Sequence, residues 1–464
     1  MGTSSQRVRI TSRTPSLRSL APWLALIVLL MVPLFVSSKS PNTWLLAYLA
    51  QTATMIVFAL SYNILLGETG LLSLGHVVHA GLGALIAARL FNAFGVPLPV
   101  LPLAGGIGGA LVGVLTGYVS TRRAGTAFAM ITLGIGELIA AAAWTLPDWF
   151  GGEAGVAIDR ASGPALGAWT FGPAREAYVL IAIWCVLACV AMFALSRTPF
   201  MRIANAVRDN PVRAAAIGCE PRRVRYASVV CAAFFAGVAG TLGLINVELV
   251  STESVGMLRS GAVLIATVIG GTGAFFGPVA GAVVLTFFSV AVASVTRAWL
   301  FYLGLLFVAV VVGSPDGLAG FAARASARLT RYGWRTCVAP WLLGASAVCA
   351  WVAAIVVAVQ WAYARQFGAD DAGSNGALAN WFPAGHADGT TPIDAHVATI
   401  AAVVVLLAAM GFVAARAARR RWASAEAMRV KREQEQGQGS ALHVATTAAV
   451  AVAANVRESH DPAP

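Results

Sequence analysis

The chain has 464 residues, of which 58% are hydrophobic and only 11% are charged, and its mean hydropathy is +0.76. A soluble protein carries about 25% charged residues, so this composition excludes an ordinary water-soluble fold. The net charge is +12, but the arginines that supply it lie in short loops between apolar runs, which is typical of a membrane protein and not of a nucleic-acid-binding protein.

Twelve apolar runs follow one another along the chain, and most approach the roughly 17 to 25 residues that a membrane-spanning helix needs. The first run has a basic flank and favours a retained signal anchor over a cleaved signal peptide. The run at 260–272 is too short to span alone and predicts a broken or re-entrant helix. Helices are predicted at about 21–37, 43–66, 75–94, 98–120, 126–149, 177–196, 226–246, 260–272, 275–296, 298–313, 338–360 and 396–415. The predicted fold class is an all-α polytopic membrane protein with about 10 core transmembrane helices and a C-terminal hairpin.

Arginine clusters predict the orientation of these helices. All clusters fall on one side of the membrane if both termini are cytoplasmic, as the positive-inside rule requires. The opposite side then receives the glycine-rich loop 150–176 and an acidic loop that contains Asp370, Asp371, Asp388 and Asp394. The chain therefore divides into a basic cytoplasmic N-terminus (1–20), a transmembrane domain (21–320), an extra transmembrane hairpin with a polar periplasmic loop (321–415) and a cytoplasmic tail (416–464) that we expect to be disordered.

Residues 65–85, LLGETGLLSLGHVVHAGLGAL, interrupt an apolar run with five glycines. Unpaired backbone groups at membrane depth are costly unless protein or water satisfies them, so such a break is typical of a helix that lines a cavity or gate. An ordinary cytoplasmic turn is the alternative. His76 and His79 are one helical turn apart, but no third metal ligand lies at suitable spacing, so no metal site is predicted.

Two series of glycines recur every four residues, a spacing that lets helices pack closely in lipid. They are Gly105, Gly109, Gly113 and Gly117, and then Gly273, Gly277 and Gly281. Glu137 lies near the middle of the fifth run, where a carboxylate is costly. It is therefore a candidate for a functional residue, and a structural hydrogen bond between helices is the alternative.

The loop 200–226 carries helix-capping signals on the arginine-rich side. Asn210 is a good N-cap, Pro211 suits the first helical position, and Gly218 can take a left-handed conformation at the end. These residues predict a short helix at 211–217, preceded by a helical stretch at 200–209. Because a solvated basic loop would not need such caps, we expect this helix to contact a partner protein.

No nucleotide-binding motif accompanies this loop. The two lysines of the chain, Lys39 and Lys431, do not end a phosphate-binding loop. If ATP drives the protein, the ATPase is another chain.

Several ordered stretches resemble the permease subunits of branched-chain amino acid ABC importers of the LivM type. They are ALSYNILLGETGLLSLGHVVHAGLGAL, ITLGIGEL with FGGEAGVAI, and AVRDNPVRAAAIGCEPRRVRYASVVCAAFFAGVAGTL followed by ATVIGGTGAFFGPVAGA and GSPDGLAG. The likeness spans about residues 40–320. It implies a pore-forming permease of the bacterial inner membrane that pairs with a homologous permease, two cytoplasmic ATP-binding subunits and a periplasmic solute-binding protein, and that is neither an enzyme nor dependent on a cofactor.

The resemblance also implies roles for particular residues. The ATPase-docking helix falls on Asn210, Pro211, Arg213, Ala214, Ala215, Ala216 and Gly218, and the translocation path or gate falls on Gly67, Gly70, Ser73, Gly75, His76 and Glu137.

Departures from the family pattern leave the transported solute open. His79, Leu85 and the sequence GVAIDR differ from the usual residues, so urea, short amides or aromatic acids are alternatives to branched-chain amino acids. A proton-coupled secondary transporter that uses Glu137 is a second class of function. An intramembrane enzyme is a third class of function, but the sequence contains no paired acids, Ser/His pair or metal-ligand set that would support it.

Overall fold

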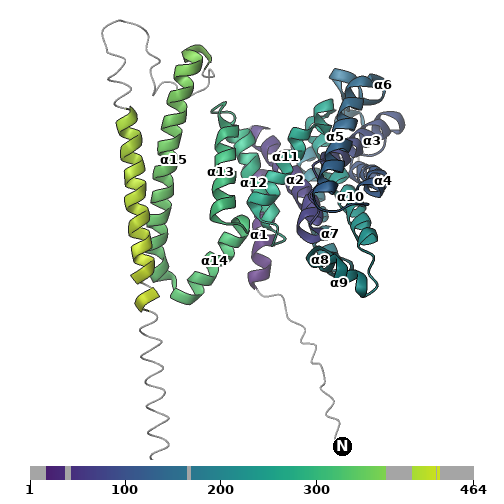
Figure 1. Ribbon diagram of the computed structural model, residues 1–464. Coiled ribbons are helices and arrows are strands. Elements are labelled where there is room, and N and C mark those ends of the chain that lie inside the picture. Colours follow the sequence, from purple (N-terminus) through teal and green to yellow (C-terminus); the bar gives the residue numbers. More distant parts are fainter. Residues whose placement is uncertain (1–16, 37–42, 165–168, 372–399, 425, 429–464) are drawn as a thin grey trace, which may run out of the picture. The chain divides into compact units, whose positions relative to one another are not determined.

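The computed structural model describes residues 17–36, 43–164, 169–371, 400–424 and 426–428 (Figure 1). The predicted acidic loop residues Asp388 and Asp394 and most of the predicted tail lie outside these residues. The chain forms two compact units. Unit 1 comprises residues 1–294 and 298–322, and unit 2 comprises residues 295–297 and 323–464.

Nearly all regular structure in the described residues is helical. Its elements are α1 (Leu17–Val36), α2 (Thr43–Asn63), the π-helical turn η1 (Ile64–Glu68), α3 (Val77–Phe94), α4 (Leu101–Ser120), α5 (Thr126–Thr145), α6 (Pro147–Phe150), the 3₁₀ turns η2 (Gly152–Ala154) and η3 (Arg160–Ser162), β1 (Val156–Ala157), α7 (Ala174–Ser196), α8 (Pro199–Asp209), α9 (Pro211–Ala216), α10 (Pro221–Val247), β2 (Leu249–Val250), the 3₁₀ turn η4 (Thr252–Val255), α11 (Met257–Gly270), α12 (Gly277–Thr286), the π-helical segment η5 (Phe287–Val292), α13 (Trp299–Gly313), α14 (Gly317–Tyr332) and α15 (Trp334–Asp371). A further helix covers Ile400–Met428.

The predicted membrane fold is confirmed, and every predicted apolar run coincides with a helix. Among the described residues, eight helices are long and apolar enough to cross a bilayer, and the bent pair α13 and α14 would make a ninth. The first, eighth and ninth runs contain shorter apolar helices, Pro22–Met31, Met257–Gly270 and Gly277–Val292. The short run predicted at 260–272 is therefore a short helix, α11, which a turn connects to a second short helix.

Helices α2 and α10 form the centre of unit 1. In their most apolar windows, 83% of the residues of the α2–η1 span and 72% of those of α10 are buried, against 17% for α5. Helices α3 and α4 pack on α10, and α7 and α12 pack on α2. Helix α5 is therefore peripheral, and most of its surface is not covered by the rest of the chain that the structure describes.

The first glycine series forms the contact between α4 and α10. A Cβ atom at Gly109 would lie 2.5 Å from the carbonyl oxygen of Ala233 and 2.9 Å from the Cα atom of Gly237. Gly105 faces Thr241 and Gly113 faces Ala233. Because these gaps are too small for a side chain, the missing Cβ atoms are what allow the two backbones to approach.

The second glycine series is only partly a helix contact. Gly277 and Gly281 lie on α12 against the backbone of α11, but Gly273 lies in the preceding turn, where a Cβ atom would have no neighbour within 4 Å. The expectation of an unbroken series was therefore wrong at Gly273. The chain reverses between α11 and α12, so the four-residue spacing across this turn is not helical.

The two ends of unit 1 carry different connections. In Figure 1, α6 lies at its upper end and α8 and α9 lie at its lower end. Loop 150–176 contributes β1, which pairs antiparallel with β2. Arg160 Nε donates to Glu248 Oε1 over 2.6 Å, which ties this loop to the end of α10.

Unit 2 contains a pair of long helices. Trp351 Nε1 of α15 donates to the carbonyl oxygen of Ala408 over 3.3 Å, and the rings of Tyr332 and Trp422 lie 6.0 Å apart. Tyr332 ends α14 directly before α15 begins, so the start of α15 lies near the end of the helix Ile400–Met428 and the two helices run antiparallel. Only 11% and 6% of the residues in the apolar windows of these two helices are buried, so the pair exposes a large apolar surface.

Candidate coupling and translocation site

Helix α9 has the capping geometry that the sequence predicts. The Asn210 side-chain oxygen accepts a hydrogen bond from the Arg213 backbone N–H over 2.9 Å, and Pro211 occupies the first helical position. Gly218 has φ = +88°, which is the predicted left-handed conformation. The helix ends at Ala216, one residue earlier than predicted.

The surface of α9 is mostly exposed. Among its alanines, Ala214 is buried, whereas Ala215 and Ala216 are exposed. Val212 is 79% exposed and Ile217 is 74% exposed, although both are apolar. These two side chains and the exposed Arg213 form a surface on α9 that is apolar with one basic residue. No described part of unit 1 covers this surface.

Helix α8 fixes α9 to the membrane helices. It is strongly amphipathic, and its buried face consists of Met201, Ala204 and Val207. Asn210, which caps the start of α9, is also the C-terminal cap that follows α8. Asn210 is therefore the one residue between the two helices.

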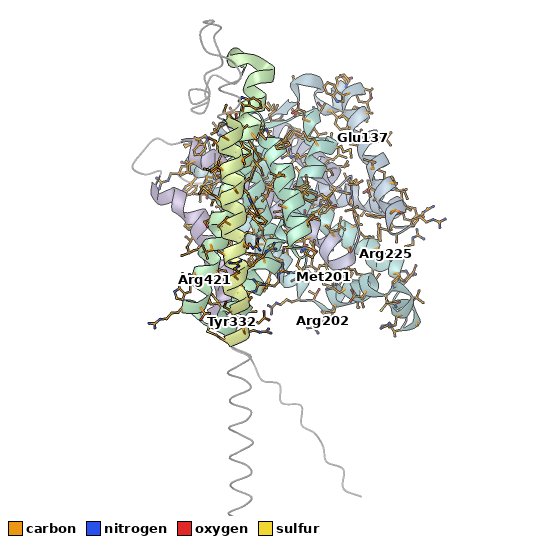
Figure 2. The ribbon with its side chains drawn as sticks, turned by 60° about the vertical axis from the view of Figure 1, so that its left-hand side comes forward. Glu137, Met201, Arg202, Arg225, Tyr332 and Arg421 are labelled. Atoms are coloured by element: carbon orange, nitrogen blue, oxygen red, sulfur yellow. The ribbon has the colours of Figure 1, made fainter. Side chains whose placement is uncertain are left out.

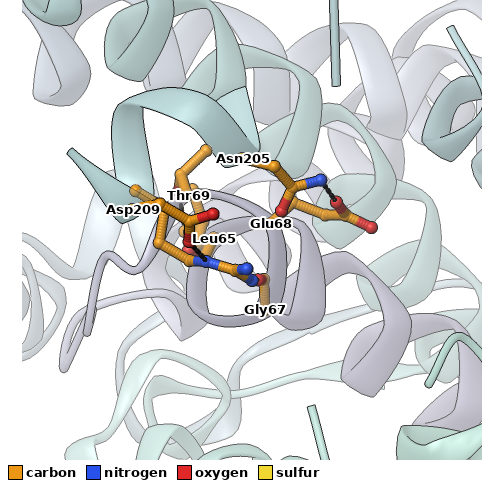
Figure 3. A network of polar contacts seen from close by, with 7 residues as sticks. Leu65, Gly67, Glu68, Thr69, Asn205 and Asp209 are labelled. Atoms are coloured by element: carbon orange, nitrogen blue, oxygen red, sulfur yellow. Dashed lines mark hydrogen bonds and ion pairs between the residues drawn. The ribbon is translucent and has the colours of Figure 1, made fainter. Parts of the chain in front are cut away.

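Two polar contacts join α8 to the break after α2 (Figure 3). Arg208 Nη1 donates to the carbonyl oxygen of Gly67, and Asn205 Nδ2 donates to Glu68 Oε2 over 2.6 Å. Both acceptors belong to the π-helical turn η1, where the wider helix leaves backbone carbonyls available. We call these two contacts the α8–η1 bridge.

The broken stretch itself is held by protein groups. After η1 the chain has no regular structure until α3 begins at Val77. Tyr62 donates its hydroxyl to the carbonyl oxygen of Ser73 over 2.9 Å, and the Leu74 N–H donates to Thr132 Oγ1 over 3.1 Å. Gly75 packs against the Thr132 carbonyl so closely that a Cβ atom could not be accommodated.

The two histidines lie at the end of this stretch, and both are buried. His76 Nε2 lies 3.1 Å from Ser61 Oγ, and its ring stacks on Phe58 with a centroid distance of 5.6 Å. His79 Nε2 lies 2.9 Å from Thr116 Oγ1. Both rings therefore connect helices through hydroxyl groups.

Two buried polar atoms beside the break have no hydrogen-bond partner among the described residues. They are Asn63 Oδ1 and His76 Nδ1. A buried polar atom needs a hydrogen bond from protein or from ordered water, so both atoms could bind a water molecule that reached this stretch.

The residues predicted for the path or gate fall into two groups. Gly67, Ser73, Gly75 and His76 are buried together in unit 1, and Gly70 lies at the surface beside α8. The cavity next to Ser73 and Gly75 has a volume of about 10 Å³, which is enough for one water molecule at most. In this conformation the break is closed.

Glu137 does not join either group. Its side chain is exposed on α5, and no described residue of the chain forms a hydrogen bond or ion pair with its carboxylate. Figure 2 shows it far from Met201 and Arg202 of α8. The structural alternative, a hydrogen bond to another helix of the same chain, is absent from the described part of the molecule.

The sequence did not identify Asn205, Arg208 or Glu68 as a contact. Arg208 is one of seven arginines in a basic loop, and its acceptor is 141 residues away. The amphipathic pattern of α8, with buried residues at 201, 204 and 207, was the only available signal that this helix packs on the membrane helices.

The comparisons with known proteins agree with this architecture. The family described as "Branched-chain amino acid transport system / permease component" matches residues 44–312. The chain belongs to this permease family. Its relatives include the high-affinity branched-chain amino acid transport system permease protein LivM of Escherichia coli (strain K12), with 28% identity over 58% of this chain and 68% of the relative, and its counterpart in Salmonella typhimurium (strain LT2), with 27% identity and the same coverage. No solved structure matches.

Apart from residues 295–297, the matched region lies within unit 1. It begins at the start of α2 and ends in α13, so it includes α8, α9 and the break, and it excludes α15 and the helix Ile400–Met428. The permease is a multi-pass protein of the bacterial inner membrane.

Proposed function

We propose that this permease is the pore-forming subunit of an importer for branched-chain amino acids or related small polar solutes, driven by separate ATP-binding subunits. The observation that carries this proposal is the α8–η1 bridge. Through α8, it connects the exposed, capped helix α9 to the irregular stretch that follows α2. A partner that moved α9 would therefore also move the break.

The mechanism starts from two polar atoms beside the break. Asn63 Oδ1 and His76 Nδ1 have no hydrogen-bond partner among the described residues. Displacement of η1 by α8 would separate Tyr62 from Ser73 and admit water, which can satisfy both atoms. We therefore propose alternating access in which ATP-driven movement of α9 opens and closes the stretch 67–76.

The exposed position of Glu137 supports a second subunit. A carboxylate that faced hydrocarbon near the middle of a spanning helix would be costly. Met130 and Leu138, which are 68% and 66% exposed, lie on the same peripheral helix. We propose that a homologous permease covers α5 and that Glu137 faces the aqueous path between the two subunits. A periplasmic solute-binding protein would deliver the solute.

Substitution of Gly218 by Val tests the docking role of α9. A β-branched residue is strained in the left-handed conformation by about 1–2 kcal/mol, and a Cβ atom at this position meets nothing within 4 Å, so only the backbone is affected. We expect the co-purified complex to retain ATP hydrolysis while solute uptake falls about tenfold. Gly218→Asn is the matched control, because Asn tolerates this conformation. Coupled uptake at the wild-type level in Gly218→Val would remove the docking role.

A proton-coupled transporter is the second candidate, favoured by the unpaired carboxylate of Glu137. It predicts that the purified chain alone carries solute into liposomes, that an ionophore abolishes this uptake, and that Glu137→Gln does the same. Uptake that requires ATP and co-purifying subunits would exclude it.

A further inference from the structure

Unit 1 contains a large open cavity whose lining includes no residue of the break or of α8 and α9. Its volume is about 760 Å³, and α2, α3, α10, α11, α12, η5 and α13 contribute to its walls. This volume is within the range of cavities that bind small molecules. Most of the wall is apolar, with Met55, Phe58, Ile265, Leu285, Trp299 and Leu303 among the lining residues.

Arg259 is the one charged residue among those that line this cavity. It lies in the first turn of α11, and its side chain reaches toward α10 and α2. A Cβ atom built on Gly243 would lie 3.5 Å from Arg259 Nη2 and 3.6 Å from Thr54 Cγ2. Within the described residues, no carboxylate or hydrogen-bond acceptor pairs with its guanidinium group.

The Arg259 side chain is exposed to this open cavity, so its guanidinium group is accessible to an anion that enters. Guanidinium groups bind carboxylates through two parallel hydrogen bonds. The N-terminus of α11 adds partial positive charge at the same place. The lining includes no Asp or Glu, so the cavity is suited to an anion and not to a simple cation.

The rest of the cavity is suited to a particular kind of carboxylate. Aliphatic and aromatic walls would bury an apolar body. The side-chain amides of Gln51 and Asn246 also line the cavity, and their carbonyl oxygens are acceptors that an ammonium group could use.

We infer that this cavity is a transport site for small carboxylates with an apolar body, such as aliphatic amino acids, and that Arg259 binds their carboxylate. This inference rests on the proposed import function and narrows its solute. Urea and short amides lack the carboxylate and would leave Arg259 unpaired.

One side chain touches both the cavity and the break. Phe58 lines the cavity and also stacks on His76, with an angle of 10° between the ring planes. Movement of the stretch 67–76 would therefore displace part of the cavity wall. This contact provides a route by which opening of the break would release a bound solute.

Photolabelling can test the site without the solute-binding protein. The full-length chain, purified with its associated subunits and placed in lipid nanodiscs, would be irradiated with a leucine analogue that carries a diazirine on its side chain. We expect labelled peptides from the lining segments of α2, α10 and α11. Excess L-leucine should compete with the label, whereas L-leucinamide should compete at least about tenfold more weakly, because it lacks the carboxylate.

Variants assign the effect to Arg259. Arg259→Gln should lower labelling about tenfold or more, and Arg259→Lys should lower it less. Gly243→Leu should also lower it, because it fills the space between Arg259 and Thr54 and keeps the charge. Arg123→Gln, the same change in the turn between α4 and α5, is the matched control and should label as wild type.

Three results would overturn the inference. They are equal competition by leucine and leucinamide, undiminished labelling of Arg259→Gln, and absence of label from the cavity peptides of the wild-type protein. ATP-dependent uptake by the same preparation with its binding protein is measured in parallel. If uptake persists while the labelling result is negative, only the cavity site fails. If uptake requires no ATP, the proposed function fails.

Discussion

Arg208 and Asn205 form the described side-chain contacts between α8 and the break, and their acceptors differ in kind. Arg208 binds a backbone carbonyl, so its contact depends on the path of the chain at Gly67. Asn205 binds the carboxylate of Glu68, which any substitution at position 68 could remove. The contact of Arg208 with the Gly67 carbonyl therefore depends more directly on the backbone conformation of η1 than the contact of Asn205 does.

Substitution of Arg208 by Gln should weaken coupling. The shorter, neutral side chain cannot reach Gly67, and loss of a charged hydrogen bond costs about 1.5–3 kcal/mol. We expect ATP-driven uptake to fall about tenfold while ATP hydrolysis by the complex persists.

Arg202→Gln is the control for this substitution, because Arg202 is exposed on the same helix. The ratio of solute imported to ATP hydrolysed is the quantity to compare. An unchanged ratio in Arg208→Gln would show that the bridge does not transmit movement.

The residue-scale predictions from sequence succeeded where the signal was local. The Asn210 cap, the proline at the first helical position and the left-handed Gly218 were all recognisable, because capping depends on neighbours within a few residues. Arg208 and Arg259 were missed because their surroundings come from distant parts of the chain. The exposure of Glu137 was missed for a related reason: the sequence gives its position along α5 but not the direction in which it points.

At the scale of helices, close backbone contact holds the centre of unit 1 together. The α4 glycines face α10, and Gly83 of α3 also meets the backbone of Gly105 and Gly237. The glycine spacing predicted that α4 would pack closely against another helix. It could not indicate that this helix is α10, because small residues allow any neighbouring helix to approach closely.

Substitution of Gly109 by Val should destabilise the permease. The side chain would overlap Ala233 and Gly237 of α10, and overpacking of this kind costs about 1–3 kcal/mol. We expect a lower thermal unfolding midpoint in detergent.

Gly134→Val is the matched control, because a Cβ atom at Gly134 on α5 has no neighbour within 4 Å. Both substitutions place the same β-branched residue within a membrane helix, so a difference in midpoint reports packing. Equal midpoints for the two variants would contradict the close contact between α4 and α10.

At the scale of the whole molecule, the family match and the division into units nearly coincide. The match ends at residue 312 and unit 1 ends at residue 322. The sequence distinguished the later hairpin by its lack of family resemblance. The sequence could not indicate that the two helices of the hairpin bury only a small part of their apolar surface, because burial depends on how they pack.

Termination of the chain after Ala322 should leave transport intact. The helices of unit 2 lie outside the matched permease region, so their loss removes none of the residues assigned to docking, the break or the cavity. We expect the shortened chain to co-purify with its partner subunits and to import solute within about twofold of the full chain. Loss of the partner subunits would instead show that the exposed apolar surface of unit 2 is needed for assembly.

Gly70 has a consequence for how this permease can vary among its relatives. The residue has φ = +68°, and a Cβ atom there would lie 2.8 Å from Cγ of Arg208. A larger residue at position 70 and a long side chain at position 208 therefore exclude each other. In an alignment of relatives, we expect these two positions to change together, and a pair that varied independently would indicate a different path for the chain after α2.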